Sequence, residues 1–228
     1  MLLLCLAALL WVGVHVGVAG SPLRGLLVAR LGEGWFRGVF SVGSVIAIAL
    51  LVSAWRAALP ETMVFWTASA GYCWIMAGVM LLAFVFFFAS VTAPNPTAVA
   101  ADTALAAEPR GITRITRHPM LWSFTLWALL HAGANGDSAS LVFFAAFAVT
   151  ALLGMPSIDA KLRARRPAAW AGFSATTSII PFAAIAAGRN RLAVREIGWL
   201  APLLAVIAWA VLLHFHRGIF GVPALVFG

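Results

Sequence analysis

Long apolar runs separated by polar connections make up most of the chain. The apolar runs cover residues 2–20, 36–58, 66–92, 119–132, 138–155 and 197–215. One helix needs roughly 20 mostly apolar residues to cross the hydrocarbon core of a bilayer, and the runs have 14 to 27 residues. The pattern predicts an all-α fold, a polytopic transmembrane helical bundle of about six spans. A chain of 228 residues then has no room for a second sizeable domain, so we expect a single integral membrane domain over residues 1–228.

The stretch AAWAGFSATTSIIPFAAIAAG at 168–188 differs from these runs. It is apolar, but it contains several Ser, Thr and Gly residues, and Pro181 interrupts it. Irregular backbone inside a membrane is tolerated only where protein groups or water form hydrogen bonds with its N–H and C=O groups. We therefore predict an interfacial or partly re-entrant segment here.

The composition supports lipid as the solvent of the outer surface. Hydrophobic residues make up 63% of the chain and charged residues 10%, whereas soluble proteins have about 25% charged residues. The formal net charge is +8, which in a soluble chain would suggest binding to nucleic acid. Because the basic residues here gather in the connections between apolar runs, we expect the lipid bilayer as partner and no nucleic acid.

The distribution of basic residues predicts the orientation. With the N-terminus outside, the connections 21–37, 93–118 and 158–196 face the cytoplasm and contain thirteen of the fifteen Lys and Arg residues; Arg56 and Arg217 fall on the other side. The positive-inside rule favours this arrangement. Residues 1–20 lack a basic start and a cleavage site of small residues, so they are interpreted as a retained first span rather than a signal peptide.

Three histidines lie inside predicted spans: His15, His131 and His214. Ionisable residues within a membrane are costly and are functional candidates by default. No carboxylate accompanies them in the spans, which argues against a carboxylate-bridged metal site or an acidic proton relay. Two interpretations stay open. The histidines are axial ligands of haem iron, or they are hydrogen-bond donors between helices. Aromatic residues that could line a haem pocket are Trp11, Trp122, Trp127, Phe124 and Trp209.

A second cluster precedes the fourth run and contains Arg114, Arg117, His118 and Pro119. Pro119 suits the first helical position, which makes His118 the capping residue. Two arginines beside a helix N-terminus favour an anion there, but on charge alone an ordinary cytoplasmic anchor is the simpler interpretation. The turn residues Asn135, Gly136 and Asp137 predict a tight hairpin to the fifth run.

These clusters together resemble the NnrU family. The central stretch is TRHPMLWSFTLWALLHAGANGD at 116–137, with WVGVH at 11–15 and WAGFSATTSIIPFAAIAAGR at 170–189. The family is associated with denitrification gene sets and shares its domain with 15-cis-ζ-carotene isomerase. The resemblance implies a bacterial inner membrane protein that binds haem b. It also implies an isomerase that acts on an apolar polyene from the membrane. An electron donor is a possible partner of such an enzyme.

The resemblance also implies ligands. The haem-linked histidines of the isomerase fall on His15 and His131, and Ala128 stands where that enzyme has a cysteine. Arg117, His118 and His214 are further cofactor-binding candidates. At 1.5 Å per residue, His15 lies about 7 Å to one side of the midplane and His131 about 6 Å to the other. By depth alone, His131 pairs better with His214, and His15 with His118.

Two alternative functions remain. One is a non-catalytic haem-containing or gas-responsive accessory protein of nitrite and nitric oxide metabolism. The other is a membrane methyltransferase that uses S-adenosylmethionine. Such enzymes are similar to this chain in three features: the cluster around His118, the hairpin after it, and the basic segment that ends at Pro181. Those enzymes have acidic residues at the head of the basic segment, where this chain has Asp159 alone. The partial match favours a shared architecture over methyl transfer.

Overall fold

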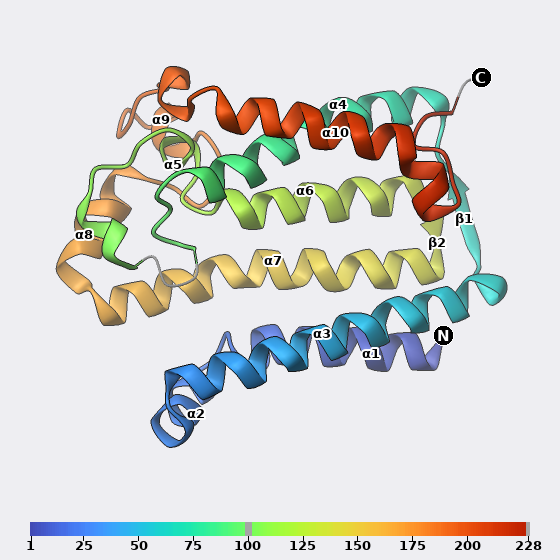
Figure 1. Cartoon of the computed structure of the whole chain (residues 1–228), viewed down its shortest axis with the longest axis horizontal. Helices are drawn as coiled ribbons and strands as arrows, with labels where there is room; N and C mark the ends of the chain where they lie inside the picture. Colours follow the sequence, from blue (N-terminus) through green and yellow to red (C-terminus); the bar gives the residue numbers. More distant parts are fainter. Residues whose placement is uncertain (99–101, 227–228) are drawn as a thin grey trace. The chain divides into compact units, whose positions relative to one another are not determined.

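A computed structural model (Figure 1) describes residues 1–98 and 102–226. Its described elements are helices apart from two short strands, which confirms the all-α class. Contacts divide the chain into two compact units. Unit 1 comprises Met1–Ala68 and Ala128–Ser157, and unit 2 comprises Ser69–Trp127 and Ile158–Gly228. The prediction that the whole chain forms one domain stays a prediction.

Unit 1 begins with two helices that lie side by side, α1 and α3 (Figure 1). Leu4 and Leu51 are fully buried within this unit. The described elements of unit 1 are α1 (Leu2–Val12), a π-helix (Gly13–Val18), α2 (Leu23–Leu31), α3 (Glu33–Ala58), a 3₁₀ turn (Leu59–Glu61), β1 (Val64–Thr67) and β2 (Asn135–Asp137), with residues 128–134 of α6 (Pro119–Ala134) and 138–157 of α7 (Ser138–Arg165).

The turn between α6 and α7 forms β2, which pairs with β1 in an antiparallel sheet. Trp66 lies opposite Gly136, and a Cβ at Gly136 would collide with the carbonyl oxygen of Trp66. Only glycine therefore fits this position. The predicted tight connection between α6 and α7 is confirmed. The pairing of this turn with β1 was not predicted from the turn residues.

Asp137 caps the N-terminus of α7. Its Oδ1 accepts hydrogen bonds from the backbone N–H of Ser140 at 2.9 Å and from Thr62 Oγ1 at 2.8 Å. Burial alone would raise the pKa of Asp137, but the hydrogen bonds from Ser140, Thr62 and Ala139 outweigh it and hold the pKa below its usual value. The carboxylate thus joins the start of α7 to the segment that precedes β1.

We expect Asp137→Ala to lower the free energy of unfolding by about 1 to 2 kcal/mol, because it removes an N-terminal cap. Thermal unfolding of the purified protein in detergent measures the change. Glu61→Ala is the matched control, since Glu61 is an exposed acid in the same unit. Equal effects of the two substitutions would contradict the capping role.

Unit 2 contains a long helix pair, α4 and α10, which run side by side (Figure 1). The indole Nε1 of Trp209 in α10 donates to the carbonyl oxygen of Ala77 in α4 at 2.8 Å. The described elements of unit 2 are α4 (Ala70–Thr92), a 3₁₀ turn (Asp102–Ala106), α5 (Ile112–Ile115), α8 (Pro167–Thr176), α9 (Ala183–Ala186), a 3₁₀ turn (Val194–Ile197) and α10 (Leu200–Phe220), with residues 119–127 of α6 and 158–165 of α7.

The number of spans is smaller than the sequence predicted. Among the described residues, four helices are long and apolar enough to cross a membrane: α3 with the turn that follows it, α4, α7 and α10. A fifth is possible if Leu2–Val18 and Leu23–Leu31 count as one span, since they are bent by 75°. The fourth predicted span, residues 119–132, forms α6, which has only 16 residues because the turn at Asn135 ends it. The chain is therefore an integral membrane protein with four to five candidate spans.

The segment predicted to be interfacial or re-entrant does not form a long helix. It consists of α8, an irregular stretch at 177–182, and the short α9. Phe182 adopts a left-handed conformation with φ 65° directly after Pro181. Helices of 10 and 4 residues are too short to cross the bilayer, as the sequence pattern indicated.

Candidate functional site

His15 lies in the π-helix of unit 1, within the sequence GVHVGV. π-Helical turns are rare and occur frequently at functional sites. The Nδ1 atom of His15 is 2.9 Å from the carbonyl oxygen of Trp11. A carbonyl oxygen only accepts hydrogen bonds, so Nδ1 carries the proton and Nε2 of the neutral ring keeps its lone pair. This backbone contact is the arrangement that orients metal-binding histidines in proteins.

Aromatic side chains connect the neighbourhoods of His15 and His131 within unit 1. We call Trp11, Phe147, Phe143 and Phe144 the aromatic row. Ring centroids are 3.9 Å apart for His15 and Trp11, 5.0 Å for Trp11 and Phe147, 5.2 Å for Phe147 and Phe143, 5.1 Å for Phe143 and Phe144, and 5.3 Å for Phe144 and His131. The four distances from Trp11 to His131 are within the usual range of aromatic contact, and the His15 and Trp11 rings are closer still. His15 therefore lies beside one end of the aromatic row and His131 beside the other, with the four rings between the two predicted haem ligands.

The side chains around His15 fit a haem group in their chemistry. Four ligands of haem iron come from the porphyrin, so the protein needs to supply only one or two imidazoles. In the part of the chain that the structure describes, no group of three or more His, Cys, Asp and Glu side chains could hold a bare metal ion. The buried Nε1 of Trp11 has no hydrogen-bond partner among these residues. It is available to donate to a polar group of a bound ligand.

A second cluster lies in unit 2, at the start of α6. The His118 side chain is fully buried, and its Nε2 is 2.8 Å from Asp159 Oδ1. Arg117 binds the same carboxylate through Nε at 3.0 Å and Nη2 at 2.6 Å. Arg117 also stacks on Trp170, with its guanidinium carbon 5.4 Å from the ring centroid. The cluster is therefore a buried ion pair with a histidine attached.

Burial lowers the pKa of His118, and this effect exceeds the opposite influence of Asp159. His118 precedes α6 and lies outside the helices long enough to span a membrane. The imidazole is thus neutral near pH 7 and donates its Nε2 proton to Asp159. The Nδ1 atom of His118 is then a buried acceptor, which has no partner among the described residues. Chemically it can take a hydrogen bond or a proton.

The backbone around this cluster is held by the irregular stretch at 177–182. Arg117 N–H donates to Ser178 O at 3.0 Å, and Phe182 N–H donates to Ile115 O at 2.8 Å. Thr116 Oγ1 donates to Ile179 O at 2.7 Å. The helix begins at Pro119, as predicted. The Arg117 side chain is only 12% exposed and binds Asp159, so it belongs to the buried cluster.

Arg114 is also paired, with a carboxylate that is more exposed than Asp159. Its Nε and Nη2 donate to Glu196 at 2.7 and 3.1 Å, and its Nη1 donates to Asn190 Oδ1 at 2.8 Å. Hydrogen bonds from Arg114 and from the backbone of Gly111 lower the pKa of Glu196 to about 2. The charge of Arg114 is therefore already balanced within the protein.

The structure divides the predicted site residues between the units. His15 and His131 belong to unit 1, whereas Arg117, His118 and His214 belong to unit 2. His214 is exposed on α10 beside Phe215. The depth-based pairs, His131 with His214 and His15 with His118, stay predictions.

Sequence reasoning identified some of the neighbouring side chains and missed others. Of the aromatic residues expected around a haem, Trp11 lies against His15, whereas Trp122 and Trp209 donate to backbone carbonyls in unit 2. The three Phe residues of the aromatic row were not predicted. The spacing of 143, 144 and 147, which lies along one side of a helix, could have identified them.

Comparisons with known proteins identify the family of this chain. The family model described as NnrU protein matches residues 3–224. The chloroplastic 15-cis-zeta-carotene isomerase of Zea mays is 35% identical over 82 residues, which are 36% of this chain and 22% of the maize protein. No solved structure gives a significant match. Since the family model covers nearly the whole sequence, the chain belongs to the NnrU family.

Proposed function

We propose that this NnrU protein binds haem b in unit 1 and isomerises a double bond of an apolar polyene of the 15-cis-ζ-carotene class. The observation that carries the proposal is the hydrogen bond from His15 Nδ1 to Trp11 O inside a π-helix. It leaves Nε2 as the only free ligand atom of that imidazole. The similarity to the maize isomerase supports the same chemistry.

In this proposal His15 and His131 hold the haem iron. When bound, haem b supplies an iron centre that exchanges electron density with a conjugated polyene and so lowers the barrier to rotation about a double bond. Trp11 donates from Nε1 to a polar group of the ligand. Phe143, Phe144 and Phe147 present an apolar surface that excludes water and packs along a flat conjugated molecule.

The substrate would enter from the lipid. A polyene is insoluble in water, and the helices of unit 1 expose many apolar side chains, Val42, Val45 and Ile46 of α3 among them. We propose a bacterial inner membrane, with the N-terminus outside and the basic connections in the cytoplasm, from the charge distribution. Because haem iron changes redox state, an electron donor is a further proposed partner.

The proposal is tested with the detergent-purified protein. We expect a Soret band, a pyridine haemochromogen spectrum typical of haem b, and conversion of 15-cis-ζ-carotene measured by chromatography under reducing conditions. Haem without conversion, together with carbon monoxide binding to the reduced protein, would favour the gas-responsive accessory protein. A haem-free protein that binds S-adenosylmethionine would contradict the proposal and favour the methyltransferase.

A further inference from the structure

Unit 2 contains a hollow that the haem proposal does not use. Its volume is about 690 Å³, within the range of about 300 to 1,000 Å³ typical of small-molecule sites. Three segments line it, residues 105–109, the exposed side of α8 and residues 188–191, together with Arg114 of α5. All of them belong to unit 2, so the hollow is formed within one compact unit.

The floor of the hollow is apolar. Leu105 and Phe173 line it and are buried together with Leu162 and Trp170. Gly172 also lines it, and a Cβ built there meets nothing within 4 Å. The floor therefore offers an apolar surface and free space for the uncharged part of a ligand.

The rim carries arginines that are not neutralised by a close carboxylate. Arg189 donates from Nη1 to the carbonyl oxygens of Ala175 at 2.7 Å and Thr177 at 3.1 Å, which fixes its guanidinium at the end of α8. The Arg191 side chain is 78% exposed, and it approaches Glu196 only at 4.0 Å. Glu196 is already engaged by Arg114 at 2.7 Å. Among the lining residues, Glu108 alone is acidic.

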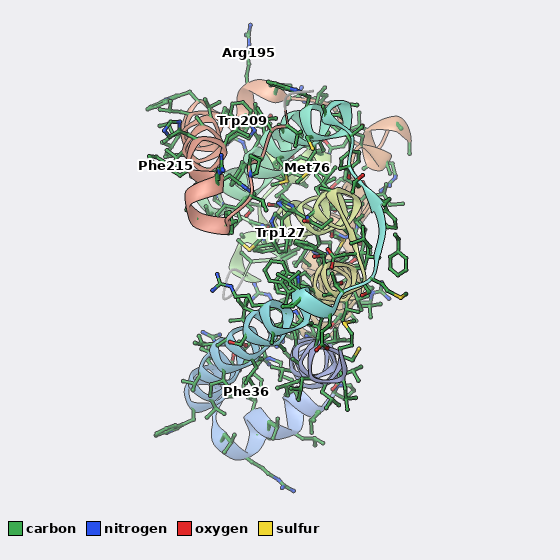
Figure 2. All side chains as sticks on the ribbon, turned by 90° about the vertical axis from the view of Figure 1, so that its right-hand side faces the viewer. Phe36, Met76, Trp127, Arg195, Trp209 and Phe215 are labelled. Carbon is green, nitrogen blue, oxygen red and sulfur yellow. The ribbon has the colours of Figure 1, made fainter. Side chains whose placement is uncertain are left out.

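The segment that continues from this rim has the composition of a membrane-surface segment. Leu192, Val194 and Trp199 are 54%, 62% and 74% exposed. Arg195 lies between them, and Figure 2 shows its side chain extending away from the ribbon. Exposed Trp and aliphatic side chains interspersed with arginines are typical of segments that contact the headgroups of a bilayer.

We propose that this hollow binds the phosphate head of an anionic membrane lipid. The guanidinium groups of Arg189 and Arg191 bind the phosphate, since planar guanidinium groups match phosphate oxygens in geometry and charge. The floor around Phe173 and Gly172 accommodates the glycerol and the first carbons of the acyl chains. Glu108 opposes the bound charge and limits the affinity.

The test measures binding of dihexanoylphosphatidic acid to the full-length protein in uncharged detergent by microscale thermophoresis, with dihexanoylphosphatidylcholine and inorganic phosphate as comparison ligands. We expect the phosphatidic acid to bind more tightly than either. Arg191→Gln should weaken it about tenfold, as the loss of a charge-assisted hydrogen bond implies. Gly172→Phe should abolish binding by filling the hollow, and Glu108→Gln should tighten it.

Arg163→Gln is the matched control, because Arg163 is an exposed arginine of the same unit outside the hollow. An equal loss of affinity in this variant would overturn the proposal in favour of a diffuse attraction to basic residues. Inorganic phosphate that binds as tightly as the lipid would also overturn it, since the apolar floor would then contribute nothing. Weaker binding in Glu108→Gln would contradict an anionic head. The Arg191 side chain is 78% exposed and approaches Glu196 only at 4.0 Å, so we expect its replacement to leave folding unaffected. Melting temperatures check this for every variant.

Discussion

Asp159→Ala is expected to lower the free energy of unfolding by about 3 to 5 kcal/mol, the usual cost of removing one partner from a buried ion pair. Asp159 is 5% exposed and accepts hydrogen bonds from both Arg117 and His118. Without the carboxylate, the Arg117 guanidinium stays in a largely buried site with no balancing charge. Chemical or thermal unfolding in detergent measures the loss.

Glu33→Ala is the matched control for this prediction. Glu33 also binds two arginines, Arg24 at 2.6 Å and Arg37 at 2.8 Å, but its side chain is 40% exposed. Solvent screens an exposed pair, so the expected loss is at most about 1 kcal/mol. Similar losses in the two variants would show that burial does not strengthen the Asp159 cluster.

A double-mutant cycle separates this pair from general packing. Because Arg117 and Asp159 act on each other, Arg117→Ala combined with Asp159→Ala should cost clearly less than the sum of the two single changes. His118 would still lack its acceptor in the double variant, so stability should not return fully to the wild-type value. Strictly additive losses would contradict a direct interaction.

Local signals at the start of α6 were sufficient to predict its boundary but not its environment. Pro119 fits a first helical turn and His118 a cap, and the helix begins there. The burial of Arg117 and His118 depends on Asp159, which lies 41 residues after His118. Charge patterning alone assigns arginines in a polar connection to solvent. It contains no information about a distant partner that removes them from solvent.

The span count shows a related limit. Apolar runs in the sequence mark membrane segments, but helix boundaries depend on turn chemistry and bends. In α6, the cap formed by Asp137 and the sheet formed by β2 end the helix early. The first run forms the continuous helical stretch Leu2–Val18, and after a 75° bend the chain continues as α2 in the connection that was predicted to be polar. Hydropathy alone does not detect either feature.

For the candidate haem site, the sequence predicted the ligands but not most of the side chains around them. His15 and His131 were identified by their type and by family resemblance, whereas the aromatic row came only from the structure. Phenylalanine is common in any membrane helix, so Phe143, Phe144 and Phe147 do not stand out in an apolar run. Their contacts with Trp11 and His131 depend on how the helices of unit 1 pack.

The second large effect is expected from His15→Gly, which should abolish the Soret band of the purified protein and with it any isomerase activity. The substitution removes the imidazole whose Nε2 is free for iron while its Nδ1 binds Trp11 O. Added imidazole should restore the Soret band, because it can occupy the space of the missing ring. Restoration separates the loss of a ligand from a failure to fold, and size-exclusion chromatography checks the folded state directly.

Three further histidine variants test whether His131 or His214 also holds the haem. His131→Ala should lose haem as His15→Gly does, since both rings adjoin the aromatic row. His214→Ala should retain it, and its loss of haem would instead favour the pair of His131 with His214 that membrane depth suggests. His216→Ala is the matched control, because the Nδ1 atom of this histidine contacts Val222 O at 2.7 Å, near the end of α10. An unchanged spectrum in both His15→Gly and His131→Ala would remove unit 1 as the haem site, while leaving the lipid-binding hollow of unit 2 to be judged by its own test.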